Sequence, residues 1–252
     1  MREQERMIRM AVLGATSAIA KECILAQGPK LERLAICGRS PDGLAAMEAH
    51  LRALWPELAI RSWVHDLAEI SEAAAIWEEM AQFCGRVDQA ILAPGVLGRQ
   101  EAMEADPLCA GELLRINCIG PTVWALLVAD FLERQGSGAL GIITSVAGMR
   151  GRSSNYIYGS SKAQLIALAE GLRCRLSAAG ARVIDFRPGM VDTPMTAGMR
   201  KGPLMASASD VGGALAKAMQ RGDGVVYSSR RWQAIMAVIK MIPFAIFRKM
   251  KI

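Results

Sequence analysis

Residues 7–20 read MIRMAVLGATSAIA. The first seven of these residues are apolar apart from Arg9, and the run has the length of a strand that is buried on both faces. Gly14 follows directly, and a helical pattern then continues to about Gln27. A glycine turn between a strand and a helix aims backbone N–H groups and a helix N-terminus at a pyrophosphate. The turn predicts a nucleotide-binding loop with contacts from Gly14, Thr16, Ser17 and Ile19, and the alternative is that Gly14 makes only a tight turn.

Short apolar strands alternate with helices along the rest of the chain. Further strands are predicted at 34–37, 60–64, 87–92, 140–145, 181–186 and 224–228, and helices at about 41–54, 71–83, 107–133, 156–178 and 211–221. Strands that are apolar throughout are typical of a parallel sheet, and right-handed crossovers place helices on both of its faces. We predict an α/β fold in which residues 1–228 form one Rossmann-type domain with a doubly wound, parallel, seven-stranded sheet. Its ligand crevice should lie at the carboxyl ends of the strands.

Cysteine and histidine usage excludes several kinds of site. The six cysteines lie far apart, with no CxxC pair, and His50 and His65 are the only histidines. This pattern suits a reducing cytoplasm and predicts neither a disulfide framework nor a metal site. The N-terminal residues MREQERMIRM carry charges throughout and lack the apolar core of a signal peptide. We expect a cytoplasmic protein.

The positive charge is concentrated in the C-terminal extension, residues 229–252. No Asp or Glu follows Asp223, whereas six cations do: Arg230, Arg231, Lys240, Arg248, Lys249 and Lys251. These six account for the whole net charge of +6, so the rest of the chain is neutral. A protein that reads nucleic acid would spread its charge over a groove or a recognition helix, so we expect no nucleic-acid partner.

The same extension has an amphipathic pattern. Helical spacing places one set of apolar residues on one side: Trp232, Ile235, Met236, Ile239 and Ile242. The apolar run is broken by Lys240 and Pro243 and is too short to cross ~30 Å of hydrocarbon. We expect residues 230–252 to lie on the cytoplasmic face of the inner membrane, with the basic side toward anionic headgroups. The alternative is a helix packed on the body or on a neighbouring subunit.

The ends of the next three strands carry further candidate contacts. The second strand ends in Cys37-Gly38-Arg39-Ser40, without the acidic residue that would accept from the ribose hydroxyls of NAD. Arg39 instead suits a 2′-phosphate, which favours NADP(H), with NAD(H) and a solvated loop arginine as the alternatives. Asp66 and Leu67 are placed to hold the adenine edge, and Ala93 and Gly95 flank a narrow turn beside the cofactor.

A second group of residues carries reaction chemistry. Tyr158 and Lys162 are four residues apart and share one helix face, and Ser145 ends a strand thirteen residues upstream of Tyr158. Reduction of a ketone needs a proton donor for the developing alkoxide and a second donor that fixes the carbonyl. We expect Lys162 to lower the pKa of Tyr158 and to bind the nicotinamide ribose. Asn117 lies mid-helix and is either a water-binding member of a proton relay or a satisfied core asparagine.

Residues 8–228 resemble the short-chain dehydrogenase/reductase family along nearly their whole length. The resemblance rests on the first glycine turn, on the Ser145, Tyr158 and Lys162 spacing, and on RPGMVDT (187–193), which is similar to the family's PGxxxT segment. It implies a catalytic tetrad of Asn117, Ser145, Tyr158 and Lys162. It also implies cofactor contacts from Tyr158, Lys162, Pro188, Gly189, Val191 and Thr193, and a homodimer or homotetramer. Departures from the family are Ala18 and Ala20 in place of glycines, and Ala93-Pro94-Gly95 in place of NAG.

A narrower resemblance involves the segments GATSAIA, APGVLG, SSNYIYGSSKA, RPGMVDTPMT and IPFAIFRK. Together they resemble decaprenylphosphoryl-2-keto-ribose reductases. That resemblance implies a 2-keto pentose on a polyprenyl phosphate, of the type that donates cell-wall arabinose, made by a separate flavin oxidase. Two alternatives stand beside it. One is a general reductase of hydrophobic ketones, hydroxysteroids or 3-oxoacyl thioesters, and the other is a non-catalytic NAD(P)-binding regulator.

Overall fold

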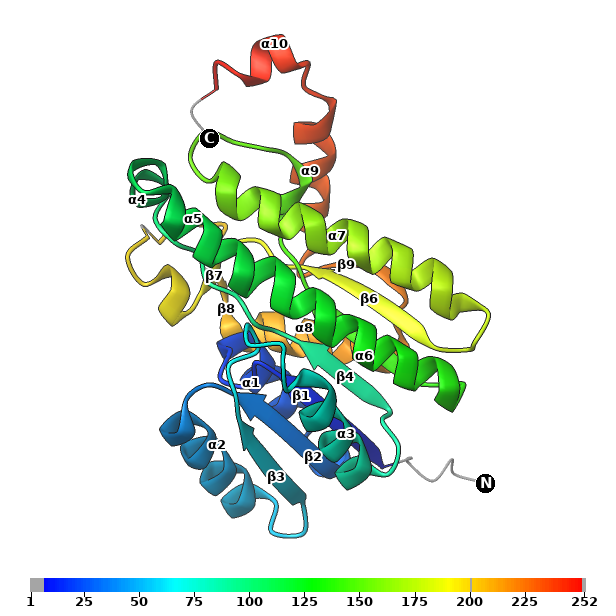
Figure 1. The fold of residues 1–252 in the computed structure, drawn as a ribbon. Coiled ribbons are helices and arrows are strands. Elements are labelled where there is room, and N and C mark those ends of the chain that lie inside the picture. Colours follow the sequence, from blue (N-terminus) through cyan, green and yellow to red (C-terminus); the bar gives the residue numbers. More distant parts are fainter. Residues whose placement is uncertain (1–6, 200, 251–252) are drawn as a thin grey trace.

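The fold is built on one sheet of seven parallel strands in the order β3-β2-β1-β4-β5-β6-β9 (Figure 1). The computed structural model describes residues 7–199 and 201–250. The strands are β1 (Ile8–Leu13), β2 (Leu31–Gly38), β3 (Ala59–Val64), β4 (Gln89–Leu92), β5 (Ala139–Ile143), β6 (Arg182–Arg187) and β9 (Gly224–Tyr227). The predicted doubly wound, seven-stranded parallel sheet is confirmed.

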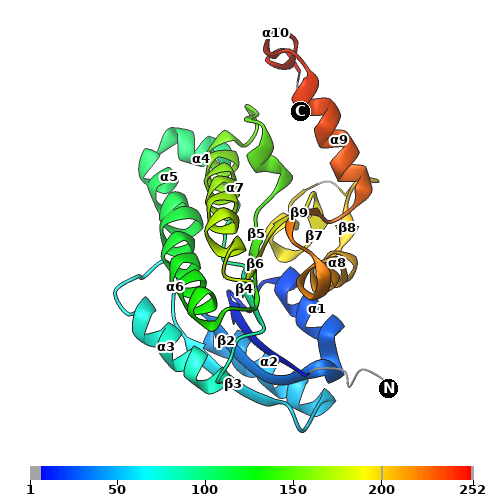
Figure 2. The same cartoon turned by 90° about the vertical axis from the view of Figure 1, so that its right-hand side faces the viewer.

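Helices cover both faces of the sheet (Figure 2). They are α1 (Ala18–Gln27), α2 (Pro41–Leu54), α3 (Ala73–Cys84), α4 (Gln100–Ala105), α5 (Pro107–Leu114), α6 (Gly120–Gln135), α7 (Tyr156–Ser177), α8 (Ala208–Arg221), α9 (Arg230–Met241) and α10 (Phe244–Phe247). Short helical turns are η1 (Gly28–Lys30), η2 (Arg115–Ile119), η3 (Val146–Met149) and η4 (Pro194–Thr196), and β7 (Val191–Asp192) pairs with β8 (Ala206–Ser207). Helices α1, α2 and α8 pack on one face, and α3, α6 and α7 pack on the other.

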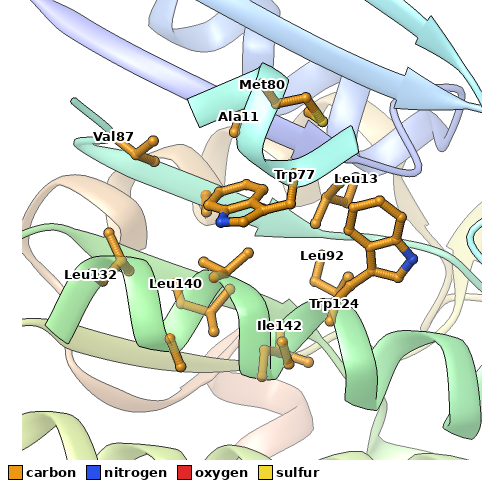
Figure 3. Close-up of a cluster of buried hydrophobic side chains, with 14 of the residues drawn as sticks. Ala11, Leu13, Trp77, Met80, Val87, Leu92, Trp124, Leu132, Leu140 and Ile142 are labelled. Atoms are coloured by element: carbon orange, nitrogen blue, oxygen red, sulfur yellow. The ribbon is translucent and has the colours of Figure 1, made fainter. Parts of the chain in front are cut away.

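Large side chains from α3 and α6 fill the core on the second face (Figure 3). Trp77 of α3 and Trp124 of α6 pack against side chains of the strands. The indole Nε1 of Trp124 donates to the carbonyl oxygen of Leu67 at 3.0 Å. This bond ties α6 to the loop after β3. By length and composition residues 107–135 resemble a membrane span, but Trp124 and Leu132 place α6 in the protein core.

The carboxyl ends of the central strands lie side by side at one end of the sheet. Leu13 at the end of β1 lies opposite Cys37 of β2 and Leu92 of β4. Strand order reverses between β1 and β4, and a crevice at such a switch point is the usual ligand site of this architecture. Gly14 has φ +84°, and a Cβ there would lie 2.8 Å from the backbone nitrogen of Pro94. Glycine is therefore required where the loops after β1 and β4 touch.

The helix predicted from Pro107 to Glu133 is interrupted. Residues 115–119 form the π-helical turn η2, whose wider winding turns Asn117 into the protein, where it is fully buried. Gly120 follows the turn, and a Cβ on it would lie 2.3 Å from the carbonyl oxygen of Leu67. The helical pattern of the sequence does not reveal the wider turn at residues 115–119, because the contacts that hold it come from loops distant in the sequence.

The C-terminal extension forms α9 and α10, with the predicted break at Pro243. Its predicted lipid-facing side is packed on the body instead: Trp232 and Met236 are buried against Val146, and Ile235 and Ile239 pack beside them. The predicted orientation of this helix is therefore wrong, and the alternative of packing on the body holds for this face. The indole of Trp232 packs against Gly189, where a Cβ would lie 2.0 Å from the ring.

Two adjacent glycines of α8 provide a test of the contact between α1 and α8. A Cβ on Gly212 would lie 2.4 Å from Cβ of Glu22 and 2.8 Å from the nitrogen of Cys23, whereas nothing lies within 4 Å of one on Gly213. Gly212→Ala should lower the free energy of unfolding by ~1–3 kcal/mol through overpacking. Gly213→Ala should raise it by about 0.5–1 kcal/mol through helix propensity. Urea unfolding measures both, and equal effects would contradict this packing.

Candidate active site

A cleft of about 360 Å³ opens at the carboxyl ends of β1 and β4. Most predicted cofactor contacts line it: Gly14, Thr16, Ser17, Ile19, Arg39, Asp66, Leu67, Ala93, Gly95 and Thr193. Lining residues that the sequence analysis did not select are Ala18, Gly38, His65, Ala68, Pro94, Val96, Ile116, Pro194 and Met195. Many of these lie next to predicted contacts at the carboxyl ends of strands. The expectation that the ligand crevice lies at those ends could therefore have found them. Five predicted cofactor contacts are not among the residues that line this cleft: Tyr158, Lys162, Pro188, Gly189 and Val191.

The nucleotide loop differs in detail from its predicted form. The backbone N–H groups of Gly14 and Ala15 donate to the carbonyl oxygen of Cys37 at 2.9 and 3.0 Å. They therefore hold β1 to β2 and do not face a ligand. The first N–H groups of α1 have no carbonyl before them in the helix, and the preceding Ser17 makes no side-chain cap. The anion-binding capacity of this loop thus lies in the first turn of α1.

Arg39 lies exposed at the rim of the cleft. Among the described residues no carboxylate forms an ion pair with it, and no acidic side chain ends β2. The neighbouring Ser40 is committed to α2, where its hydroxyl oxygen accepts from the nitrogen of Gly43 at 3.1 Å. Arg39 is consequently available to an anionic group in the cleft.

Lys162 of α7 is buried below the cleft. Its Nζ donates to the carbonyl oxygen of Ile143 at 3.1 Å, and a Cβ on Gly95 would lie 3.4 Å from this Nζ. Burial lowers the pKa of Lys162 to about 8, and a nearby thiol, Cys118, only partly opposes the shift. The amine therefore carries a proton at neutral pH and can release it within the ordinary pH range.

Tyr158 lies one turn before Lys162, with the Lys162 Nζ 5.9 Å from the centre of its ring. Burial raises the pKa of Tyr158, and the side chain of Ser145 partly lowers it. The direction is opposite to the one expected from the sequence, because loss of hydration outweighs other effects and the Lys162 amine bonds to a carbonyl. Tyr158 therefore remains a neutral phenol at pH 7, which suits a proton donor.

Ser145 is held beside Tyr158 by the turn η3. Its hydroxyl oxygen accepts from the nitrogen of Ala147 at 3.1 Å, and its side chain also hydrogen-bonds to Tyr158. Two glycines let η3 approach α7 closely. A Cβ on Gly148 would lie 2.6 Å from the nitrogen of Ala163, and one on Gly159 would lie 3.0 Å from the oxygen of Ala147. Backbone contact thus fixes the serine relative to the tyrosine.

Asn117 is a satisfied buried amide. Its Oδ1 accepts from the nitrogen of Val96 at 2.8 Å, and its Nδ2 donates to the oxygen of Val96 at 2.8 Å and to Oγ of Ser161 at 3.1 Å. Ser161 in turn donates to the carbonyl oxygen of Tyr158 at 2.7 Å. Asn117 therefore ties the loop after β4 to the helix that carries Tyr158 and Lys162. Of the two roles predicted for Asn117, its side chain fits that of a core asparagine whose hydrogen bonds are satisfied.

A buried polar network behind Ser145 was not anticipated. Asp185 on β6 accepts from Oγ1 of Thr144 at 2.6 Å and from Nε of Arg187 at 2.8 Å. The pair raises the pKa of Arg187 against the opposing effect of burial. A carboxylate inside the apolar strand ARVIDF was the available signal, because such a group needs partners. The network aligns the ends of β5 and β6, where Val146 then donates to the oxygen of Pro188 at 3.1 Å.

A second, shallow hollow of about 720 Å³ adjoins the cleft at Gly95 and Val96. It is lined by Leu97, Gly98, Arg99, Met195, Gly198 and Met199 as well. Its walls are mostly apolar, with Arg99 as the charged member.

The arrangement groups a neutral phenol, a serine hydroxyl and a buried amine, and the amine lies beside Gly95 in the wall of the cleft. The cleft also offers a helix N-terminus and an unpaired guanidinium. Such a site can bind an extended anionic ligand and protonate an oxygen atom beside it. Among the described residues no three histidine, cysteine or acidic side chains converge on a metal site.

Comparison with known proteins gives one consistent result. A family profile described as short chain dehydrogenase matches residues 9–203. An uncharacterized oxidoreductase of Mycobacterium tuberculosis is 30% identical over 243 residues, which are 96% of this chain and 96% of that protein. An uncharacterized oxidoreductase of Streptomyces coelicolor is 33% identical over 247 residues, which are 96% of this chain and 95% of that protein.

Solved structures share the fold. The 3-oxoacyl-[acyl-carrier protein] reductase from Brucella melitensis, in complex with NAD, has a TM-score of 0.78 at 22% identity and covers 91% of this chain and 98% of its own. A gluconate 5-dehydrogenase from Burkholderia cenocepacia, in complex with NADP and tartrate, has a TM-score of 0.79 at 17% identity and covers 92% of this chain and 98% of its own. At these identities the likeness concerns the fold alone.

The burial of Lys162 should make the free energy of unfolding depend on pH. Folding lowers its pKa from 10.5 to about 8, so the folded state binds the proton less tightly than the unfolded state. The cost is ~3 kcal/mol at most, is fully present below pH 8, and disappears as the pH rises through 10.5. Lys162→Met should therefore stabilise the protein at pH 7 and lose that advantage by about pH 10.

Urea unfolding at the two pH values measures the effect. Lys217→Met, at an exposed lysine of α8, is the matched control and should show no such pH-dependent gain. An advantage of Lys162→Met that is constant with pH would contradict the burial of a charged amine.

Proposed function

This chain belongs to the short-chain dehydrogenase/reductase family of oxidoreductases that act on CH–OH and C=O groups, and from this premise we propose that it uses NADPH to reduce a ketone to a secondary alcohol. The observation that carries the proposal is the buried Lys162 amine, next to a neutral Tyr158 and beside Ser145. The Lys162 amine lies beside Gly95, which lines the cleft.

The donor groups of the cleft fit a nicotinamide dinucleotide. The first turn of α1, which contains Ile19, would hold the pyrophosphate together with Thr16 and Ser17 just before it. Asp66 and Leu67 would hold the adenine, and Arg39 the 2′-phosphate that distinguishes NADPH. Thr193 would hold the carboxamide, with the backbone of Pro188, Gly189 and Val191 behind it. When bound, the cofactor supplies the hydride.

The side chains of this chain handle the proton. Ser145 donates its hydroxyl hydrogen to the substrate oxygen and fixes the position of that oxygen. Tyr158 gives its phenolic proton to the same oxygen as negative charge develops there. The Lys162 ammonium favours the phenolate that this transfer leaves behind, and its pKa of about 8 lets it pass a proton on. Asn117 positions Val96 and Ser161 around them.

The substrate class that the sequence best supports is a 2-keto pentose on a polyprenyl phosphate. The shallow hollow beside the cleft supports this choice, because apolar walls with Arg99 at the edge suit a substrate with both apolar and anionic parts. A separate flavin oxidase would make the ketone. The proposal includes peripheral contact of residues 230–252 with the cytoplasmic face of the inner membrane.

A second candidate is a general reductase of hydrophobic ketones, hydroxysteroids or 3-oxoacyl thioesters. The methionines Met195 and Met199 in the hollow favour it, because flexible apolar side chains accept varied substrates. Undiminished activity on short soluble ketones would select this candidate over the lipid-linked sugar.

We also expect a homodimer or homotetramer. Three exposed apolar side chains on the α5–α6 segment support this expectation: Leu114, Ile119 and Leu126. Sedimentation of the purified protein measures the subunit number directly.

Tyr158→Phe is the direct test of the reaction. Loss of the proton donor should reduce turnover of polyprenylphosphoryl 2-keto-pentose by about 10²–10⁴-fold while NADPH affinity changes little. Tyr156→Phe, at an exposed tyrosine one half-turn away, should keep wild-type turnover. NADPH should outperform NADH in the same assay, because Arg39 has no described acidic partner. Substantial turnover by Tyr158→Phe would overturn the assignment.

A further inference from the structure

The C-terminal extension has two apolar surfaces, and only one of them is used by the protein. The inner surface of α9 buries Trp232 and Met236 against Val146. The outer surface and α10 leave four large apolar side chains exposed. These are Val238 at 63%, Met241 at 82%, Phe244 at 72% and Ile246 at 57% of their full accessible areas. We call these four side chains the apolar tip.

The apolar tip stands apart from the body of the protein. In Figures 1 and 2, α9 leaves the sheet beyond β9 and α10 lies at the far extremity of the molecule. The four exposed apolar side chains lie within nine residues of the chain. An apolar stretch at such an extremity marks an interaction site rather than ordinary surface variation.

The charges around the apolar tip are of one sign. Lys240, Arg248 and Lys249 are exposed among these side chains, and the sequence has no Asp or Glu after Asp223. None of the three cations forms an ion pair with a described residue. The combination of exposed aliphatic and aromatic side chains with uncompensated cations matches an anionic lipid surface.

A second copy of this chain fits the tip poorly. Pairing two tips would bring Lys240, Arg248 and Lys249 against their own copies with no carboxylate between them, and like charges at an interface are unfavourable. A bilayer has no such conflict, because its acyl region accepts apolar side chains in any arrangement and its headgroups supply negative charge.

The tip is joined to the catalytic loop by Arg150. This residue directly follows η3, the turn that begins after Ser145. Its guanidinium donates to the carbonyl oxygens of Ile239, Lys240 and Ile242, the last at 2.6 Å, and lies 4.0 Å from the centre of the Phe247 ring. Phe247 is buried at this contact. The end of α9, α10 and the Ser145 loop are therefore one connected unit.

We propose that the apolar tip inserts into an anionic bilayer, with Lys240, Arg248 and Lys249 on its headgroups, and that Arg150 holds the catalytic loop beside that bilayer. The proposal corrects the predicted lipid-facing side: the membrane contact is made by the outer surface of α9 and by α10. It rests on the proposed function in that it specifies the membrane contact of residues 230–252, and it is independent of the proposed reaction. Its consequence is that a lipid-linked ketone would reach the cleft from the membrane side.

The test is co-sedimentation of the full chain with vesicles. Wild type should bind vesicles of equal parts phosphatidylcholine and phosphatidylglycerol, and bind phosphatidylcholine alone at least tenfold more weakly. The variant Met241→Ser/Phe244→Ser/Ile246→Ser should lose at least tenfold in binding. The control Val64→Ser/Ile70→Ser/Leu108→Ser removes three exposed apolar side chains elsewhere and should bind as wild type does. Thermal unfolding checks that each variant is folded.

Three results would overturn the proposal. They are wild type that stays in the supernatant, a tip variant that binds as wild type does, and wild type that self-associates without vesicles while the tip variant does not. The last result would assign the tip to a second copy. Tyr158→Phe should bind vesicles like wild type, so a failure of the proposed reaction and a failure of the membrane contact give different results.

Discussion

The structure is organised around one buried positive charge, the ammonium of Lys162. A charge without water needs partners nearby, and the protein supplies them from loops distant in the sequence. Ile143 at the end of β5 accepts its hydrogen bond, Gly95 leaves the space beside it, and Asn117 fixes the loop in which Gly95 lies. Favourable interactions in the rest of the fold offset the free energy that burial of this amine costs. What is gained is a proton-handling group whose pKa of about 8 lies close to neutrality.

The loops around that charge are rigid because backbone touches backbone. Glycine permits these contacts at Gly14 against Pro94, at Gly148 against Ala163, and at Gly189 under the Trp232 indole. The last contact links the C-terminal extension to the loop that follows β6. Arg150 adds a second link between the extension and the turn after Ser145. The extension is therefore part of the site's framework, and its outer surface alone is available to a partner.

Much of the fold and of the site could be predicted from local patterns. Apolar strands and glycine turns placed the parallel sheet, and the expectation of a ligand crevice at the carboxyl ends of the strands placed most residues of the cleft. The remainder depends on contacts that local patterns do not encode. The π turn at Asn117 is held by Val96, and the inner surface of α9 finds Gly189, which has no side chain. The pKa of Tyr158 was predicted in the wrong direction, because its burial, which raises that pKa against the hydrogen bond from Ser145, follows only from the three-dimensional packing.

We expect a ketone in this site to receive its hydride from the bound cofactor and its proton from Tyr158. The most direct measurement supplies NADPH that carries deuterium at the transferable position of the nicotinamide, together with polyprenylphosphoryl 2-keto-pentose, and locates the label by mass spectrometry. The account predicts one deuterium on the carbon of the new alcohol, while the hydroxyl proton exchanges with water. Deuterium that stays on the cofactor, or an alcohol carbon that takes hydrogen from the solvent, would contradict it.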